Sequence, residues 1–288
     1  MRRFLLFALL GALCTVATAQ KKATVIIQVT DPQMGFQSDN RDMKFEIAEY
    51  TKAVEAINSL HPDAVVFTGD YVHDRTNEAQ WAEFNRITSL INQETRKVFI
   101  PGNHDVDLDE DGEVIDLPYL SHIGESDRFS LKINNVLITG INSNLIKYEN
   151  PEKDCKTALG ACEKGQIKWL EEALGQKKKG DVSIVFTHHP FFLNDIDEEE
   201  GYSTQAPDKR KLYFDIFKSH GVSYVFSGHL HDNAQASYEG IGMITTTAVG
   251  RQLGKAFPGV RVIIVNGKKL TERFYLLDEL SNLKREDL

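Results

Sequence analysis

The sequence predicts an α/β fold in which mixed β-sheets are covered by helices. Short β-branched runs alternate along the chain with amphipathic segments whose apolar residues recur every three or four positions. Near the C-terminus, two strand-like runs, Val260 to Val265 and Lys269 to Leu277, flank Asn266-Gly267, a dipeptide preferred in two-residue type I′ turns. A terminal hairpin after an alternating chain indicates antiparallel strands beside parallel ones, rather than a purely doubly wound sheet.

The remaining elements follow from the same periodicities. Strands are predicted at Thr24 to Val29, Ala64 to Thr68, Lys97 to Ile100, Val136 to Ile141, Val182 to Thr187 and Val222 to Ser227. Two helices are predicted from apolar residues spaced by three and four, namely Ile47, Tyr50, Val54 and Ile57, and then Trp81, Phe84, Ile87 and Ile91. Two more are expected over Lys164 to Leu174 and Asp208 to His220.

The N-terminus has the pattern of a secretory signal peptide. Arg2 and Arg3 precede an apolar run from Phe4 to Cys14, and Ala17-Thr18-Ala19 provides the small residues of a cleavage site. The run is shorter than the about 20 apolar residues of a spanning helix. A buried first helix is the alternative. We expect residues 1–19 to be removed, residues 20–288 to form one domain, and the protein to be exported to the periplasm or secreted.

The cysteines are interpreted as structural. Removal of residues 1–19 also removes Cys14, so that Cys155 and Cys162 remain. In an oxidising compartment a disulfide between them is expected, and two buried or free thiols are the alternative. A structural zinc site is a third interpretation and has little support, because neither cysteine belongs to a C-x-x-C pair.

Composition limits the classes of ligand. The chain has 288 residues, of which 41% are hydrophobic and 26% charged, as in ordinary globular proteins. Its net charge of -9 would become -11 after loss of Arg2 and Arg3. An acidic surface repels the phosphate backbone of nucleic acid, so we expect no nucleic-acid polymer as a partner. The sequence does not indicate an oligomeric state.

Polar side chains follow five of the predicted strands at their carboxyl ends, where open α/β sheets place ligand sites. The clusters are Asp31-Pro32-Gln33, Gly69-Asp70, Gly102-Asn103-His104-Asp105, His188-His189-Pro190 and Gly228-His229-Leu230-His231. Each cluster alone has a turn or helix-cap explanation. That explanation does not account for aspartate, asparagine and histidine at successive strand ends.

These residue types favour a metal centre. Carboxylates, imidazoles and a carboxamide bind hard or borderline divalent ions, and cysteine is absent from the clusters. Because the candidate ligands outnumber the four positions of one tetrahedral zinc, we expect two divalent ions (Mn, Mg, Fe or Zn), about 3.5–4 Å apart and able to act on a phosphoryl group. Two such ions would make the site locally electropositive despite the acidic chain, so phosphate esters are not excluded.

The order Asp-x-Gln, Gly-Asp, Gly-Asn-His-Asp, His and Gly-His-x-His resembles the calcineurin-like metallophosphoesterases over essentially the whole mature chain. The resemblance extends to a eukaryotic group, the calcineurin-like phosphoesterase domain-containing serine/threonine phosphatases. It is carried by Asp31 to Gly35, by Val225 to His229 with Asn233-Ala234, by Ala248 to Gly254 and by Tyr275 to Leu280. It implies a four-layer α/β/β/α sandwich, the metallo-dependent phosphatase fold, with a dinuclear centre between two sheets.

The resemblance also implies roles for individual residues. Asp31, Gln33 and His231 would bind the first metal, Asp70 would bridge both, and Asn103, His188 and His229 would bind the second. His104 would be the general acid. His188 is preferred to His189 as a ligand because it lies two residues before the proline, as the ligand does in the family. His189 would then line the entrance or pack.

Gln33 departs from the superfamily pattern, in which this position is usually histidine. A carboxamide is a poorer donor than imidazole, so the first metal is expected to be bound more weakly or to be a harder ion such as Mg²⁺ or Mn²⁺. The eukaryotic relatives share the glutamine, which makes it a feature of a subgroup.

The implied reaction is direct hydrolysis of a phosphate ester, in which a metal-bridging hydroxide attacks phosphorus and His104 protonates the departing alkoxide. A phosphomonoesterase, including one acting on phosphoprotein, is favoured. The alternatives are a phosphodiesterase acting on nucleotides or glycerophosphodiesters and, with less support, a catalytically silent binding module of the same fold. The acidic segment from Asn194 to Lys211 is interpreted as a polar excursion before a helix, close enough to His188 to border the substrate cleft.

Overall fold

The central feature of the structure is a pair of mixed β-sheets. A computed structural model describes residues 23–108, 114–116, 118–124, 126–148 and 162–288. The first sheet has five strands in the order β13-β12-β1-β2-β3. Their bounds are β1 (Thr24–Val29), β2 (Ala64–Phe67), β3 (Arg96–Phe99), β12 (Gly259–Asn266) and β13 (Lys269–Leu276). Strands β1, β2 and β3 are parallel, and the terminal hairpin of β12 and β13 adds the two antiparallel strands.

The second sheet has six strands in the order β10-β11-β9-β8-β7-β6. They are β6 (Phe129–Ile133), β7 (Val136–Gly140), β8 (Val182–Phe186), β9 (Val222–Ser227), β10 (Ala234–Tyr238) and β11 (Ile241–Thr245). The four inner strands are parallel, and each edge strand is antiparallel to its neighbour. A separate short pair is formed by β4 (Asp107–Leu108) and β5 (Val114–Asp116).

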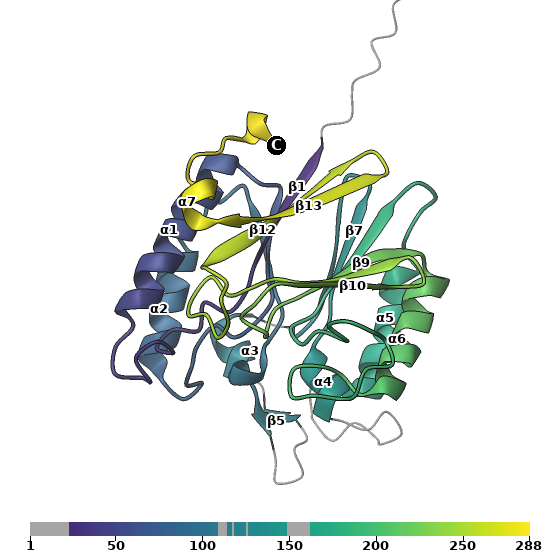
Figure 1. Cartoon of the computed structure of the whole chain (residues 1–288), viewed down its shortest axis with the longest axis horizontal. Helices are drawn as coiled ribbons and strands as arrows, with labels where there is room; N and C mark the ends of the chain where they lie inside the picture. Colours follow the sequence, from purple (N-terminus) through teal and green to yellow (C-terminus); the bar gives the residue numbers. More distant parts are fainter. Residues whose placement is uncertain (1–22, 109–113, 117, 125, 149–161) are drawn as a thin grey trace, which may run out of the picture.

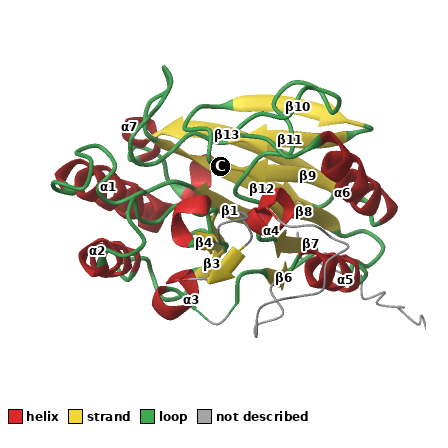
Figure 2. Ribbon diagram, turned by 90° about the horizontal axis from the view of Figure 1, so that it is seen from below, coloured by secondary structure: helices red, strands yellow, loops and turns green. Residues whose placement is uncertain are grey.

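Helices cover the outer face of each sheet (Figure 1). The five-stranded sheet carries α1 (Lys44–Leu60), α2 (Glu78–Thr88) and α7 (Leu277–Leu280), and the six-stranded sheet carries α5 (Glu163–Leu174) and α6 (Pro207–Ser219). The view from below shows the two helical layers on opposite sides of the strands (Figure 2). The short helices are α3 (Pro118–His122) and α4 (Ser143–Tyr148), with 3₁₀ turns η1 (Asn103–Asp105) and η2 (Arg285–Asp287). The expected four-layer α/β/β/α sandwich is therefore confirmed.

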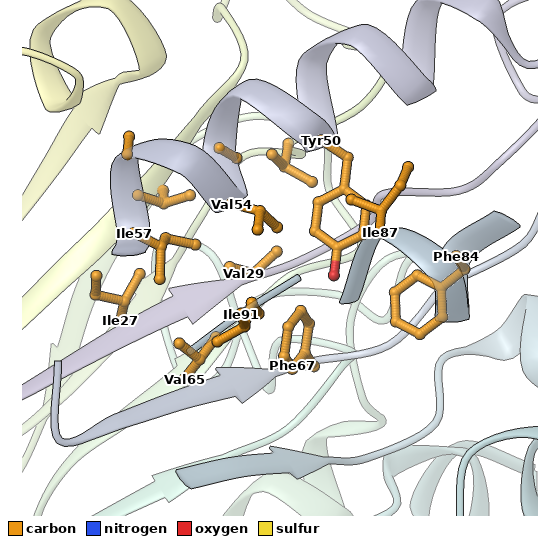
Figure 3. Packing of buried hydrophobic residues seen from close by; sticks show 14 of the residues in the cluster. Ile27, Val29, Tyr50, Val54, Ile57, Val65, Phe67, Phe84, Ile87 and Ile91 are labelled. Carbon is orange, nitrogen blue, oxygen red and sulfur yellow. The ribbon is translucent and has the colours of Figure 1, made fainter. Parts of the chain in front are cut away.

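Three buried clusters hold the four layers together. The first lies between α1, α2 and the five-stranded sheet, where Tyr50, Val54 and Ile57 of α1 meet Val29 and Phe67 (Figure 3). The second packs α5 and α6 against the other sheet. The third lies between the sheets and includes Ile26, Val66, Ile184 and Ile263. β1, β2, β8 and β9 contribute apolar side chains to both an outer and an inner cluster, so they are mainly apolar on both faces, as is typical of buried parallel strands.

The predicted elements agree with the structure to within a few residues at their ends. β1 and β9 have the predicted bounds, β3 and β12 differ from theirs by one residue at each end, and the other predicted strands differ by one residue at one end. The β12–β13 hairpin is present, but its turn lies one residue later than predicted: Asn266 pairs with Lys269, so Gly267 and Lys268 are the turn residues. Of these two only Gly267 has a positive φ (+61°), which fits a type II′ turn with glycine first and not the predicted type I′ turn. β6, β10 and β11, the short β4–β5 pair and the short helices α3, α4 and α7 were not predicted from the sequence. Among the described residues, no helix has the length and apolar character needed to cross a membrane.

The predicted signal peptide and Cys155 lie outside the described residues. Cys162 is disulfide-bonded. Its pairing with Cys155 and the cleavage after Ala19 stay predictions.

Candidate metal centre

The loops that follow β1, β2, β3, β8 and β9 meet at one place. Backbone hydrogen bonds join the first two loops, from Asp31 N to Gly69 O (3.1 Å) and from Gln33 N to Asp70 O (2.9 Å). The amide of His229 donates to Asp31 Oδ2 (3.1 Å) and so connects the two sheets. The side chains predicted from the five strand-end clusters are therefore brought together by the fold.

Asp31, Asp70 and His231 form the first group of ligand atoms. Their ligand atoms lie within 4.8 Å of one another, and all three residues are buried. His231 Nε2 lies 3.4 Å from Asp31 Oδ1. Gln33 is also buried, and its Oε1 atom accepts no hydrogen bond from the described residues. A buried carboxamide oxygen without a donor, in a loop whose backbone is bonded to Asp70, fits a cation ligand, because leaving it unsatisfied costs about 1–3 kcal/mol.

The second group is centred on His188. Its Nε2 atom lies 3.1 Å from Asn103 Oδ1, 3.2 Å from His229 Nδ1 and 3.4 Å from Asp70 Oδ2. Asp70 therefore contacts both groups, which is the position that a bridging carboxylate needs. The donor set of carboxylate, carboxamide and imidazole fits two divalent ions of the hard or borderline kind.

Backbone carbonyl groups orient two of the imidazoles. His188 Nδ1 lies 2.7 Å from Thr68 O, and His231 Nδ1 contacts Arg251 O. A carbonyl oxygen can only accept, so each Nδ1 carries the hydrogen and each Nε2 faces the site. Such outer contacts fix the tautomer and the ring orientation of metal-binding histidines.

The acids and imidazoles shift each other's pKa values. Burial raises the pKa of Asp70, but His188 and His104 outweigh burial and hold this pKa well below its usual range. Burial lowers the pKa of His188, but Asp70 outweighs burial and raises it to about 9. His229 behaves differently, since burial and His188 lower its pKa to about 3. The site thus combines an ionised carboxylate, Asp70, with a neutral imidazole, His229.

The backbone of the site is strained. Positive φ angles, which are uncommon outside glycine, occur at Asp31 (53°), Gln33 (38°), Asp70 (53°), His229 (67°) and His231 (52°). Such conformations cost of order 1–3 kcal/mol each and persist where surrounding structure enforces them, commonly at functional sites. Here the surrounding contacts include the hydrogen bonds from Gln33 N to Asp70 O and from His229 N to Asp31 Oδ2.

His104 stands beside the two groups without belonging to either. Its backbone N–H donates to Asp70 Oδ1 (2.9 Å), and its Nδ1 lies 2.8 Å from His73 O. Its ring also stacks on that of His73, with the ring centroids 5.2 Å apart. These contacts leave Nε2 as the ring nitrogen available to a substrate.

His189 is fully buried beside the second group. Its ring centroid lies 4.4 Å from that of His229, and a ligand atom of His189 lies within 4.8 Å of ligand atoms of His188 and His229. Its Nδ1 atom is 2.9 Å from Ser143 Oγ, whereas Nε2 has no partner among the described residues. Burial and His229 hold its pKa well below the usual range, so the ring is neutral. His188 contacts Asp70 and Asn103 directly, which favours His188 as the ligand.

Two buried side chains outside the predicted set hold the site loops. Asp105 Oδ2 accepts from the amides of Asp70 (2.8 Å) and Gly102 (2.7 Å), and Oδ1 accepts from Tyr71 N (3.0 Å). Gln80 of α2 accepts from the amides of His73 and Asp74, both at 2.9 Å, and donates to Asn40 Oδ1 (2.7 Å). The role of Asp105 could have been predicted, because it directly follows His104 in a strand-end cluster. Nothing in the sequence indicated a role for Gln80.

Comparison with known proteins agrees with this geometry. The model of the calcineurin-like phosphoesterase family matches residues 24–233. The serine/threonine-protein phosphatase CPPED1 of Homo sapiens is 34% identical over 275 residues, which cover 89% of this chain and 85% of that protein. A protein of Arcobacter nitrofigilis named "Probable glycerophosphodiester phosphodiesterase GpdQ" is 24% identical over 234 residues, 80% of each chain.

A solved structure has the same fold. The purple acid phosphatase PPD1 from yellow lupin (Lupinus luteus) seeds superposes with a TM-score of 0.68 at 12% sequence identity. The match covers 90% of this chain and 52% of that one, so the chain spans about half of the lupin protein.

Proposed function

Because the chain belongs to the calcineurin-like phosphoesterase family and is a metal-dependent phosphoester hydrolase, we propose that it is a phosphomonoesterase with a dinuclear metal centre. The observation that carries the proposal is the contact of Asp70 with both ligand groups, with His104 bonded to the same carboxylate. Similarity to a serine/threonine-protein phosphatase over 89% of the chain supports a monoester substrate, including phosphoprotein.

The ligands divide between the two ions as follows. Asp31, Gln33 and His231 would hold the first ion, Asn103, His188 and His229 would hold the second, and Asp70 would serve both. When bound, two divalent ions supply Lewis acidity, which activates water at neutral pH and neutralises charge on the phosphoryl group.

The residues of the chain perform the remaining steps. His188 and His231 donate from Nδ1 to Thr68 O and Arg251 O, which keeps these two imidazoles in the tautomer that presents Nε2 to the site. His104 is the general acid. Its Nδ1–H is held by His73 O, and its Nε2–H passes a proton to the alkoxide that leaves phosphorus. No side chain forms a covalent bond to phosphorus in this scheme.

A substrate panel tests the proposal. Protein stripped of metal and reloaded separately with Mn²⁺, Mg²⁺, Zn²⁺ or Fe²⁺ is assayed with p-nitrophenyl phosphate, bis-p-nitrophenyl phosphate and a phosphoserine peptide. We expect higher kcat/KM for the monoesters. Higher kcat/KM for the diester would favour the second candidate, a phosphodiesterase, which similarity to the Arcobacter protein supports. Turnover of neither class with any ion would contradict both and favour a binding module.

We also propose that the protein is exported and that residues 1–19 are removed, on the basis of the charged start, the apolar run and Ala17-Thr18-Ala19. N-terminal sequencing of protein recovered outside the cytoplasm should begin at Gln20. Recovery of an intact Met1 terminus from the cytoplasm would contradict this proposal.

A further inference from the structure

The loop of residues 193–206, between β8 and α6, is built around a buried cation. Arg210 of α6 is fully buried and donates to the carbonyl oxygens of Gln205 (2.7 Å), Ile196 (3.1 Å) and Glu199 (3.3 Å), and it also contacts the carbonyl of Glu198. One guanidinium thus binds carbonyl groups on both sides of the loop. Charge-assisted bonds of this kind are stronger than neutral ones, so they hold the loop in one conformation.

Further contacts hold the same loop from the side of α4 and from within. Lys147 of α4 donates to Thr204 O (2.8 Å) and Gly201 O (3.2 Å). The Glu198 carboxylate accepts from the amides of Leu193 (2.8 Å) and Asn194 (2.9 Å). The polar excursion expected from the sequence is therefore an ordered loop, and the residue between these anchors has a defined position.

That residue is Tyr202. Its side chain is 72% exposed, yet its ring centroid lies 5.1 Å from that of the buried His229. Its phenol also interacts with the side chain of Asn103. Because so much of the ring remains in water, burying it contributes little free energy, and hydrophobic burial is not the reason that the loop holds Tyr202 in this position. The loop instead places a phenol beside two residues of the second ligand group.

We propose that Tyr202 is a substrate-binding residue whose phenol donates a hydrogen bond to a phosphoryl oxygen of the ester. The inference rests on the proposed phosphoesterase function and adds a protein donor to the phosphate subsite. Asn103 Oδ1 faces His188 Nε2, so the amide nitrogen of Asn103 is the group that donates to the phenol oxygen. The phenol then keeps its own hydrogen for the phosphate.

Tyr202→Phe, Tyr202→Ala and a control, Tyr275→Phe, test the proposal. Tyr275 lies on β13, where its ring packs under Arg273, away from both ligand groups. Each variant is compared with the wild type for metal content, for kcat/KM with p-nitrophenyl phosphate and a phosphoserine peptide, and for binding of inorganic phosphate by calorimetry. We expect Tyr202→Phe to keep both metals, to lower kcat/KM by about 10-fold to 100-fold and to weaken phosphate binding similarly. Tyr275→Phe should match the wild type.

Three results would overturn the proposal. Unchanged phosphate binding and kcat/KM in Tyr202→Phe would exclude the phenol as a donor. If kcat/KM and phosphate binding fell only in Tyr202→Ala, the ring and not the hydroxyl would be responsible. If Tyr202→Phe lost metal, the role of the hydroxyl would be to position Asn103 and not to bind phosphate. A failure of the proposed phosphoesterase function can be told apart from a failure of this proposal. In the first case the wild type would turn over no ester, but the comparison of phosphate binding between the wild type and Tyr202→Phe would still test the role of the phenol.

Discussion

His188 donates a hydrogen bond from Nδ1 to the carbonyl oxygen of Thr68, at 2.7 Å, and its Nε2 lies 3.4 Å from Asp70 Oδ2. The carbonyl fixes which nitrogen faces the site, and the carboxylate attracts a proton to that nitrogen. The same contacts that prepare His188 to bind a metal therefore also make a proton compete with the metal for Nε2.

Metal affinity should depend on pH because of this competition. In the metal-free protein Asp70 raises the pKa of His188 to about 9 against the effect of burial, so at pH 7 Nε2 carries a proton that a metal must displace. As the pH increases toward 9, metal affinity should rise about tenfold per pH unit for each proton that binding releases. Chelator competition at pH 6, 7 and 8 measures the affinity, and an indicator dye measures the protons released. Equal affinity at all three pH values would contradict the prediction. His188→Asn should reduce the proton release.

His188 and His189 should differ in their effect on metal content. His188→Ala should lose the second ion, because it removes the nitrogen that contacts Asn103, His229 and Asp70. His189→Ala should keep both ions, because His189 is bonded to Ser143 and only packs beside the group. Elemental analysis of the two purified variants measures the difference. Loss of one ion from His189→Ala would show that His189 is a ligand.

The general acid should be separable from metal binding. His104→Ala should keep both metals and lose about 10²-fold to 10⁴-fold in kcat for an alkyl phosphate, whose alkoxide needs a proton. The loss should be smaller for p-nitrophenyl phosphate, whose leaving group is stable without one. His220→Ala, at the end of α6 and outside the site, is the matched control. An equal loss for both substrates would contradict the assignment.

Much of this site was predictable because strands and metal ligands leave local signals. Short runs rich in β-branched and aromatic residues predicted β1 and β9 to the residue, and polar clusters at strand ends indicated Asp31, Asp70 and His188. The strands that were not predicted leave weaker signals. β10 contains one aromatic and no β-branched residue, and β11 is interrupted by Gly242, so neither has the composition of a buried strand. Their pairing is determined by the neighbouring sheet.

The strained backbone was not predictable from the ligand residues themselves. Aspartate and histidine rarely adopt positive φ, and nothing in Asp31 or His229 indicates it. The conformation is stabilised by distant contacts, such as the bond from His229 N to Asp31 Oδ2 between the two sheets. The role of Gln80 was hidden for the same reason, because its partners come from three separate loop positions.

Gly102 should be required for its lack of a side chain. Its φ of -92° suits any residue, but an added Cβ would lie 2.1 Å from Asp70 Oδ1 and 2.4 Å from Asp70 N. Gly102→Ala should therefore displace the shared carboxylate, lower metal content and lower the free energy of unfolding by about 1–3 kcal/mol. Gly124→Ala is the control, since its added carbon would meet no atom within 4 Å. Full metal content in Gly102→Ala, measured by elemental analysis, would contradict the prediction.

Gln80 should position His104 through His73. Gln80 Oε1 accepts from the amides of His73 and Asp74, and His73 O accepts from His104 Nδ1. Gln80→Ala leaves two amides without their acceptor and should cost about 1–3 kcal/mol of stability for each amide that water does not reach. Metal content should remain, whereas kcat should fall more for alkyl than for p-nitrophenyl phosphate, because the proton donor is displaced. Gln80→Glu keeps the acceptor oxygen but replaces the donor to Asn40 with a buried negative charge, so it should recover part of the kcat for the alkyl ester at a cost in stability. If both variants lowered kcat equally for both esters, Gln80 would act on the fold in general and not on His104.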